Sequence, residues 1–212
     1  PMHNDPVKRM ENRKYCQEQL RLADYIGAQC CVNITGSCGP IWDGGYAENY
    51  ADDIRLRIID TTREIIDAVT PSKTFYTLEP MPWMLPDSPE SYLDLLKEVD
   101  RPGFGVHMDV VNMISCPERY FFNDRFAEKC FALLGAHVKS CHVKDVRLER
   151  FLTFNLKETA CGQGGLDIVR YAQLADASSP DMPFLIEHLT TEEEFLHSLD
   201  YVKKLLAGIP MH

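Results

Sequence analysis

The chain has 212 residues and a formal net charge of −10, because 32 acidic side chains outnumber 22 basic ones. An acidic surface repels phosphate backbones, so we do not expect nucleic acid as a partner. No apolar run reaches the ~18 residues that cross a bilayer, so no membrane-spanning segment is expected. The length and the 45% share of hydrophobic residues predict a single globular domain over residues 1–212.

Helical and extended patterns alternate along the chain. Gly27 ends the first helical pattern as a C-cap would, Ser88 precedes another as an N-cap would, and Thr191 with Glu194 matches a capping box. The stretch between residues 143 and 165 shows no regular pattern. The predicted helices cover 8–27, 50–69, 88–99, 118–134, 167–176 and 191–206, and the predicted strands cover 30–34, 74–78, 104–108, 138–142 and 184–186.

Short strands that alternate with helices predict a parallel sheet and therefore an α/β fold. Five predicted strands fit either a doubly wound open sheet or an incomplete (β/α)8 barrel. The ends of the strands distinguish the two. In a barrel the carboxyl ends of the strands converge on one axis, whereas in an open sheet they lie in a row with neighbours ~4.8 Å apart.

Four successive predicted strands end in a side chain that can bind metal. These residues are Glu79, Asp109, His142 and Glu187. A lone carboxylate at a strand end is often a helix cap, and a lone histidine is often a core residue. The prediction of a metal site therefore depends on all four strand ends together. Three carboxylates and one imidazole favour Mn²⁺ or Mg²⁺, with Mn²⁺ expected first and Zn²⁺ or Co²⁺ as alternatives. The sequence therefore predicts one divalent metal per chain in a barrel.

The eight cysteines show no C-x-x-C pair, which argues against a zinc ribbon or a thioredoxin-like motif. Several of them lie in apolar runs, as buried thiols do. We expect reduced thiols and a cytoplasmic protein.

Several segments resemble the xylose-isomerase-like TIM barrels. The matching segments are YTLEPMPWMLPDS, GVHMDVVNMI, SCHVKDVRLE, GQGGLD and FLIEHL, in that order. This family of sugar-phosphate isomerases and epimerases includes ketose 3-epimerases and inosose dehydratases, and endonuclease IV is a distant relative. The additional histidines that an endonuclease IV-like site needs are not apparent here.

The resemblance implies roles for the four strand-end residues. Glu79, Asp109, His142 and Glu187 would hold the metal, and Glu79 and Glu187 would also form the acid/base pair. The five predicted strands would then be strands four to eight of a (β/α)8 barrel, without its three N-terminal βα units. The epimerases commonly carry a histidine three residues after the Asp of strand six, where this sequence has Asn112.

Five residues are candidates for contact with substrate. His107 lies two residues before Asp109 on the same strand face, and it could equally be a core histidine. Lys144 has the same relation to His142 and could bind a phosphate or a hydroxyl group. Trp83 either walls the pocket or packs in the core, Arg147 either binds an anion or lies solvated, and the amide of Asn112 can bond a hydroxyl.

The predicted function is a metal-dependent sugar or sugar-phosphate isomerase or epimerase that moves a proton between carboxylates through an enediolate. An inosose-type dehydratase and a non-catalytic metal- or sugar-binding protein stay open as alternatives. The expected partner is a small sugar or polyol, and a homo-oligomer is left open.

The missing strands generate a prediction. We expect the full gene to encode roughly 80–100 further N-terminal residues, judged from ~30 residues per βα unit. Intact-mass analysis of the natural protein checks this, and a natural mass near 24.2 kDa would contradict it.

Overall fold

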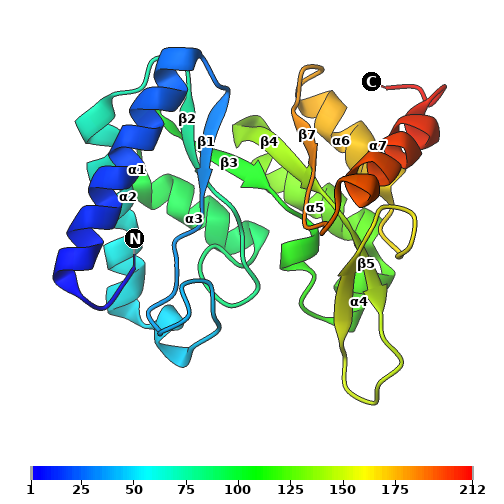
Figure 1. The fold of residues 1–212 in the computed structure, drawn as a ribbon, viewed down its shortest axis with the longest axis horizontal. Helices are drawn as coiled ribbons and strands as arrows, with labels where there is room; N and C mark the ends of the chain where they lie inside the picture. Colours follow the sequence, from blue (N-terminus) through cyan, green and yellow to red (C-terminus); the bar gives the residue numbers. More distant parts are fainter. Residues whose placement is uncertain (1, 212) are drawn as a thin grey trace. The chain divides into compact units, whose positions relative to one another are not determined.

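The computed structural model describes residues 2–211. This part of the chain forms two compact units that divide between His107 and Met108, and each is described by itself. Figure 1 colours the first from blue to green and the second from green to red. No helix among the described residues is long and apolar enough to cross a membrane. The single domain expected over residues 1–212 stays a prediction.

The first unit alternates helices and strands as predicted. β2 pairs in parallel with β1 on one side and with β3 on the other, with Cys31 opposite Tyr76 and Tyr76 opposite Phe104. Helices α1 and α2 pack against each other. The elements are α1 (Pro6–Ile26), β1 (Cys30–Asn33), a 3₁₀ turn (Ala47–Tyr50), α2 (Asp52–Val69), β2 (Phe75–Leu78), α3 (Pro89–Val99) and β3 (Phe104–Met108).

Local chemistry sets the limits of these helices. Gly27 ends α1 with φ 74°, a left-handed conformation that glycine adopts without steric cost. Ser88 caps α3 by accepting from the backbone N–H of Ser91. The buried Tyr92 on α3 then donates from its hydroxyl to the carbonyl groups of Leu78 and Gly105, which ties the helix to strands β2 and β3.

The second unit contains one parallel strand pair and one antiparallel hairpin. β4 pairs with β7, with His142 opposite Leu185, and β5 pairs with β6 (Figure 1). Helix α6 packs on α5, and its buried Tyr171 donates to the carbonyl groups of Met108 and His142. The elements are α4 (Pro117–Phe121), α5 (Asn123–Leu134), β4 (Val138–Val143), β5 (Asp145–Leu148), β6 (Leu156–Thr159), α6 (Ile168–Ser178), β7 (Phe184–Ile186) and α7 (Glu192–Leu206), with 3₁₀ turns at Val111–Met113 and Gly135–His137.

Two expectations about this unit are wrong. The helix predicted over 118–134 breaks at Phe122, whose backbone has φ −121° and ψ 47°, so that α4 and α5 are separate helices. The stretch 143–165, expected to be irregular, contains the β5–β6 hairpin. The other predicted helices and strands are confirmed to within two residues at each end.

Asp145, at the start of β5, anchors the loop that follows the hairpin. Its buried carboxylate accepts from the backbone N–H groups of Gly162, Gly164 and Leu166 at 2.9–3.0 Å, and from its neighbour Val146 at 2.8 Å. A Cβ atom at Gly164 would collide with this carboxylate and with the carbonyl oxygen of Val146. The glycine-rich loop is therefore a structural turn around one carboxylate.

The close approach at Gly164 predicts a stability difference within this loop. Gly164→Ala forces Asp145 or the backbone to move, and we expect a loss of about 1–3 kcal/mol in the free energy of unfolding. Gln163→Ala, at the exposed neighbouring position, should change it by less than about 0.5 kcal/mol. Urea denaturation of both variants checks this, and equal midpoints would contradict the role of the anchor.

Candidate metal centre

Asp109, His142 and Glu187 bring three metal-binding side chains together in the second unit. His142 lies on β4, Glu187 directly follows β7, and Asp109 directly follows β3. Nδ1 of His142 is 3.0 Å from Oε2 of Glu187 and 3.8 Å from Oδ2 of Asp109, and each residue offers a ligand atom within 4.8 Å of the others. Ligand atoms about 2.0–2.2 Å from one ion lie up to about 4.4 Å apart, so the 3.0 and 3.8 Å distances from His142 fit a divalent metal.

Burial and a backbone hydrogen bond fix Asp109. Its side chain is 1% exposed, and Oδ1 accepts from the backbone N–H of Asn112 at 3.0 Å. That bond closes the turn after β3 and directs Oδ2 toward His142 and Lys144. The backbone N–H of Asn112 therefore orients Asp109, and substrate binding by the Asn112 side chain stays a prediction.

Lys144 lies at the centre of the carboxylates. Its Nζ is 2.9 Å from Oδ2 of Asp109, 3.1 Å from Oε2 of Glu187 and 3.1 Å from Oε1 of Glu158. The side chain is almost fully buried. Burial would lower the pKa of Lys144, but these three carboxylates raise it above its ordinary value. The carboxylates that balance the charge of Lys144 also lie beside the imidazoles of His142 and His188.

Glu158 and His188 complete this network, and neither was predicted from the sequence. Oε2 of Glu158 is 2.6 Å from Nδ1 of His188, and Nε2 of His188 is 3.2 Å from Oε1 of Glu187. Burial would raise the pKa of Glu158, but His188 and Lys144 lower it. The hydrogen bond to Glu158 raises the pKa of His188. Glu158 lies on β6, in the stretch expected to be irregular, so its neighbours could not be anticipated.

Glu187 is held as a carboxylate. Burial would raise its pKa, but the hydrogen bond with His142 and the charges of Lys144, His142 and His188 lower it to about 2. A carboxylate with so low a pKa stays ionised at neutral pH and is ready to bind a metal ion.

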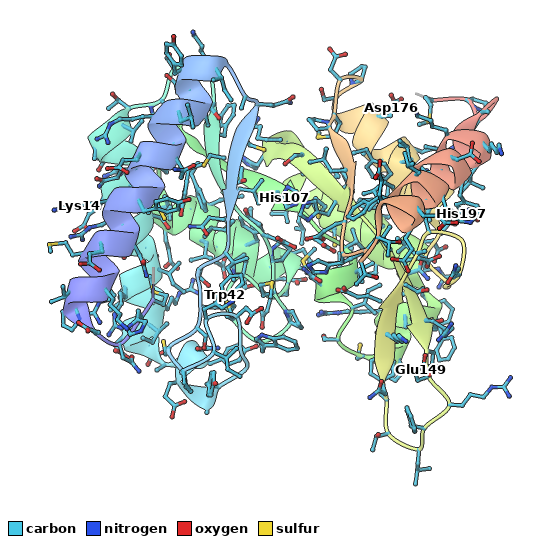
Figure 2. The ribbon with its side chains drawn as sticks, in the orientation of Figure 1. Lys14, Trp42, His107, Glu149, Asp176 and His197 are labelled. Atoms are coloured by element: carbon cyan, nitrogen blue, oxygen red, sulfur yellow. The ribbon has the colours of Figure 1, made fainter. Side chains whose placement is uncertain are left out.

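The cleft beside this network lies between the hairpin and the start of α7. It has a volume of about 780 Å³, within the range of small-molecule sites, and its lining includes Arg147, Glu158, His188 and His197. Figure 2 labels His197 on α7 and Glu149 at the end of the hairpin. Arg147 is half exposed and pairs with Glu149 at 2.9 Å. An anion at Arg147 would have to compete with that ion pair.

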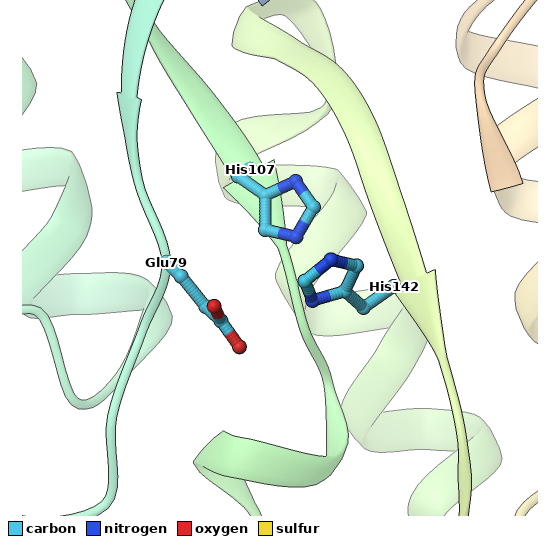
Figure 3. Close-up of side chains that lie close together, drawn as sticks. All are labelled: Glu79, His107 and His142. Carbon is cyan, nitrogen blue, oxygen red and sulfur yellow. The ribbon is translucent and has the colours of Figure 1, made fainter. Parts of the chain in front are cut away.

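Glu79, His107 and Trp83 belong to the first unit. The backbone N–H of Glu79 donates to the carbonyl of Asn33, and ligand atoms of Glu79 and the fully buried His107 lie within 4.8 Å of each other (Figure 3). The indole N–H of Trp83 donates to the carbonyl of Asp43, so this side chain holds the loop before α2. A contact between Trp83 and substrate stays a prediction.

The three ligand atoms of the second unit predict the outcome of two substitutions. The wild-type protein should bind one divalent ion per chain, and Asp109→Ala or His142→Ala should remove it because each deletes a direct ligand. Elemental analysis after dialysis against Mn²⁺ measures the occupancy. Asp181→Ala and His197→Ala are matched controls at exposed positions and should keep the wild-type content. Unchanged metal in both ligand variants would contradict the site.

Solved structures similar to this chain share its fold. A xylose isomerase-like TIM barrel protein from Mycobacterium smegmatis, in complex with magnesium, matches with a TM-score of 0.74 and 16% identity, over 95% of this chain and 69% of that one. D-psicose 3-epimerase with D-tagatose from Clostridium cellulolyticum H10 matches with a TM-score of 0.67 and 13% identity, over 96% and 73%. The probable 3-DHS dehydratase of petrobactin synthesis from Bacillus anthracis matches with a TM-score of 0.71 and 16% identity, over 98% and 73%.

The family comparison covers almost the whole chain. A search of curated proteins found no match. The sequence profile of one family matches residues 1–205, and this agrees with the alternating helices and strands and with the similar solved structures. The chain belongs to the xylose isomerase-like TIM barrel family.

Proposed function

We propose that this protein is a divalent-metal-dependent isomerase or epimerase acting on a small sugar or sugar phosphate. The observation that supports the proposal is the cluster of Asp109, His142 and Glu187, whose metal-binding atoms lie close together beside the Lys144 ammonium. The similarity in fold to D-psicose 3-epimerase supports the proposed substrate class. Mn²⁺ is the proposed metal, with Mg²⁺, Zn²⁺ and Co²⁺ as alternatives.

Glu79 is proposed as the fourth ligand. It belongs to the other compact unit, so this part of the proposal rests on its position directly after β2 and on the resemblance of the strand ends. Glu79 and Glu187 would also form the acid/base pair, one removing a proton from the carbon beside the carbonyl and the other returning one.

The metal, when bound, supplies Lewis-acid stabilisation of the negative charge that develops on the oxygens of the sugar. This stabilisation matters because a carbon beside a sugar carbonyl is only weakly acidic, and a carboxylate is a weak base for it. Lys144 would hold a substrate oxygen with the same ammonium group that now bonds Asp109 and Glu187. His107, Asn112, Trp83 and Arg147 are the further proposed substrate contacts.

A dehydratase is the second candidate. The similarity to a probable 3-DHS dehydratase favours it, and so does Asn112, which stands where the epimerases commonly carry a histidine and cannot titrate. A dehydratase would use the same metal and the same carboxylates, but one of them would protonate a departing hydroxyl group. The two reactions differ in product mass, because only the dehydratase releases water.

The acid/base assignment predicts the effect of Glu→Gln substitutions. Glu187→Gln and Glu79→Gln keep an oxygen that can bind metal but lose the basic carboxylate. With metal occupancy held high, we expect turnover to fall by about 10²–10⁴-fold or more and sugar binding to change far less. Turnover is measured on a panel of ketoses and inososes in deuterated water, where an epimerase should incorporate deuterium at the substrate carbon. Glu18→Gln, at an exposed position on α1, is the control.

Three outcomes separate the candidates. A product lighter by one water supports the dehydratase. Stoichiometric binding of metal and sugar without deuterium exchange or water loss supports a binding protein and contradicts both enzymes. A metal-loaded Glu187→Gln variant that turns over at the wild-type rate would contradict the acid/base role and leave a structural metal site.

A further inference from the structure

His188 has an unusual backbone conformation directly after a proposed metal ligand. Its φ is 54°, in the left-handed region that residues other than glycine rarely adopt. The residue follows Glu187 at the end of β7, and its side chain is half exposed toward the cleft. Unfavourable backbone conformations persist where the surrounding contacts enforce them, and they are frequent at functional sites. The contacts of the His188 imidazole are therefore candidates for a functional role.

The imidazole lies between two carboxylates. Nδ1 is 2.6 Å from Oε2 of Glu158 and Nε2 is 3.2 Å from Oε1 of Glu187. The other oxygen of Glu187, Oε2, is 3.0 Å from Nδ1 of His142 and 3.1 Å from Nζ of Lys144. The two oxygens of Glu187 thus have different neighbours. Oε2 faces His142 and Lys144, and Oε1 faces His188.

We propose that His188 is a positioning residue for Glu187, holding the carboxylate in the rotamer that presents Oε2 to the metal. This inference rests on the proposed function, because it assumes that Glu187 binds an ion. A carboxylate with one constrained oxygen loses less conformational entropy when the other binds metal, and groups behind a ligand often set its affinity in this way.

Glu158 gives His188 a fixed support. It lies on β6, whose partner β5 begins at the anchoring residue Asp145. Oε1 of Glu158 contacts Lys144 while Oε2 contacts His188, so the hairpin supports both groups that lie beside Glu187. The left-handed turn at His188 allows this bridge, because it places the imidazole beside the side chain of the residue directly before it.

Two isosteric substitutions separate the contacts of the two ring nitrogens. In Gln the amide nitrogen occupies the position of Nε2, so His188→Gln keeps the contact with Glu187. In Asn it occupies the position of Nδ1, so His188→Asn keeps the contact with Glu158 and loses the one with Glu187. If His188 acted only through its left-handed backbone, His188→Gln would weaken metal binding more than His188→Asn. The reason is that Asn adopts the left-handed conformation more readily than Gln.

The experiment measures the affinity of the full chain for Mn²⁺ by titration calorimetry and the visible spectrum of bound Co²⁺. We expect His188→Asn to weaken Mn²⁺ binding by about 10–100-fold and to change the Co²⁺ spectrum. His188→Gln should stay near the wild type in both measurements. His197→Asn, in the same cleft but outside the contacts described above, is the matched control and should behave as the wild type.

The outcomes distinguish this inference from the proposed function. If the wild-type protein binds neither ion, the proposed metal site fails and the inference fails with it. If the wild type binds metal and His188→Asn binds it equally well, or if His188→Gln is the more damaging change, only the positioning role is overturned. Thermal denaturation in the presence of a chelator confirms that each variant is folded before the comparison is made.

Discussion

The buried ammonium group of Lys144 is the constraint on which the rest of the candidate site depends. Removing a charge from water costs several kcal/mol, and a buried ion is stable only where oppositely charged groups surround it closely. Asp109, Glu187 and Glu158 do so at 2.9–3.1 Å. These side chains come from the end of β3, the end of β7 and the middle of the hairpin, so one cation brings three distant segments of the second unit together. Two of these carboxylates, Asp109 and Glu187, are also proposed ligands of the divalent ion.

The sequence alone predicts the metal-binding set because its signal is local. Asp109, His142 and Glu187 each end an apolar run, and a parallel fold brings such positions to one edge of the sheet. The alternation of helices and strands and the caps at Gly27, Ser88 and Thr191 depend on neighbouring residues in the same way, and the structure confirms them. The strand period of two also predicts that Lys144 lies on the same strand face as His142, and its contact with substrate stays a prediction.

The hairpin and the contacts behind the ligands could not be predicted, because their causes are not local. Strands β5 and β6 have four residues each, and Leu148 and Leu156 pair across a loop that shows no hairpin turn signal. Without that pairing, Glu158 has no predictable neighbours. His188 is not predicted because its contacts with Glu158 and Glu187 come from segments distant in the sequence or from backbone geometry, whereas sequence patterns indicate local propensity. The break at Phe122 has no proline or glycine to mark it.

The proposed function and the proposed role of His188 both depend on whether a metal ion binds beside Lys144. Anomalous diffraction from crystals soaked in Mn²⁺ answers it directly, because the signal locates the ion independently of the protein atoms. We predict one strong peak about 2.0–2.2 Å from ligand atoms of Asp109, His142 and Glu187. Full occupancy elsewhere, with no peak among these three residues, would contradict this site and leave Lys144 as a structural partner of the carboxylates.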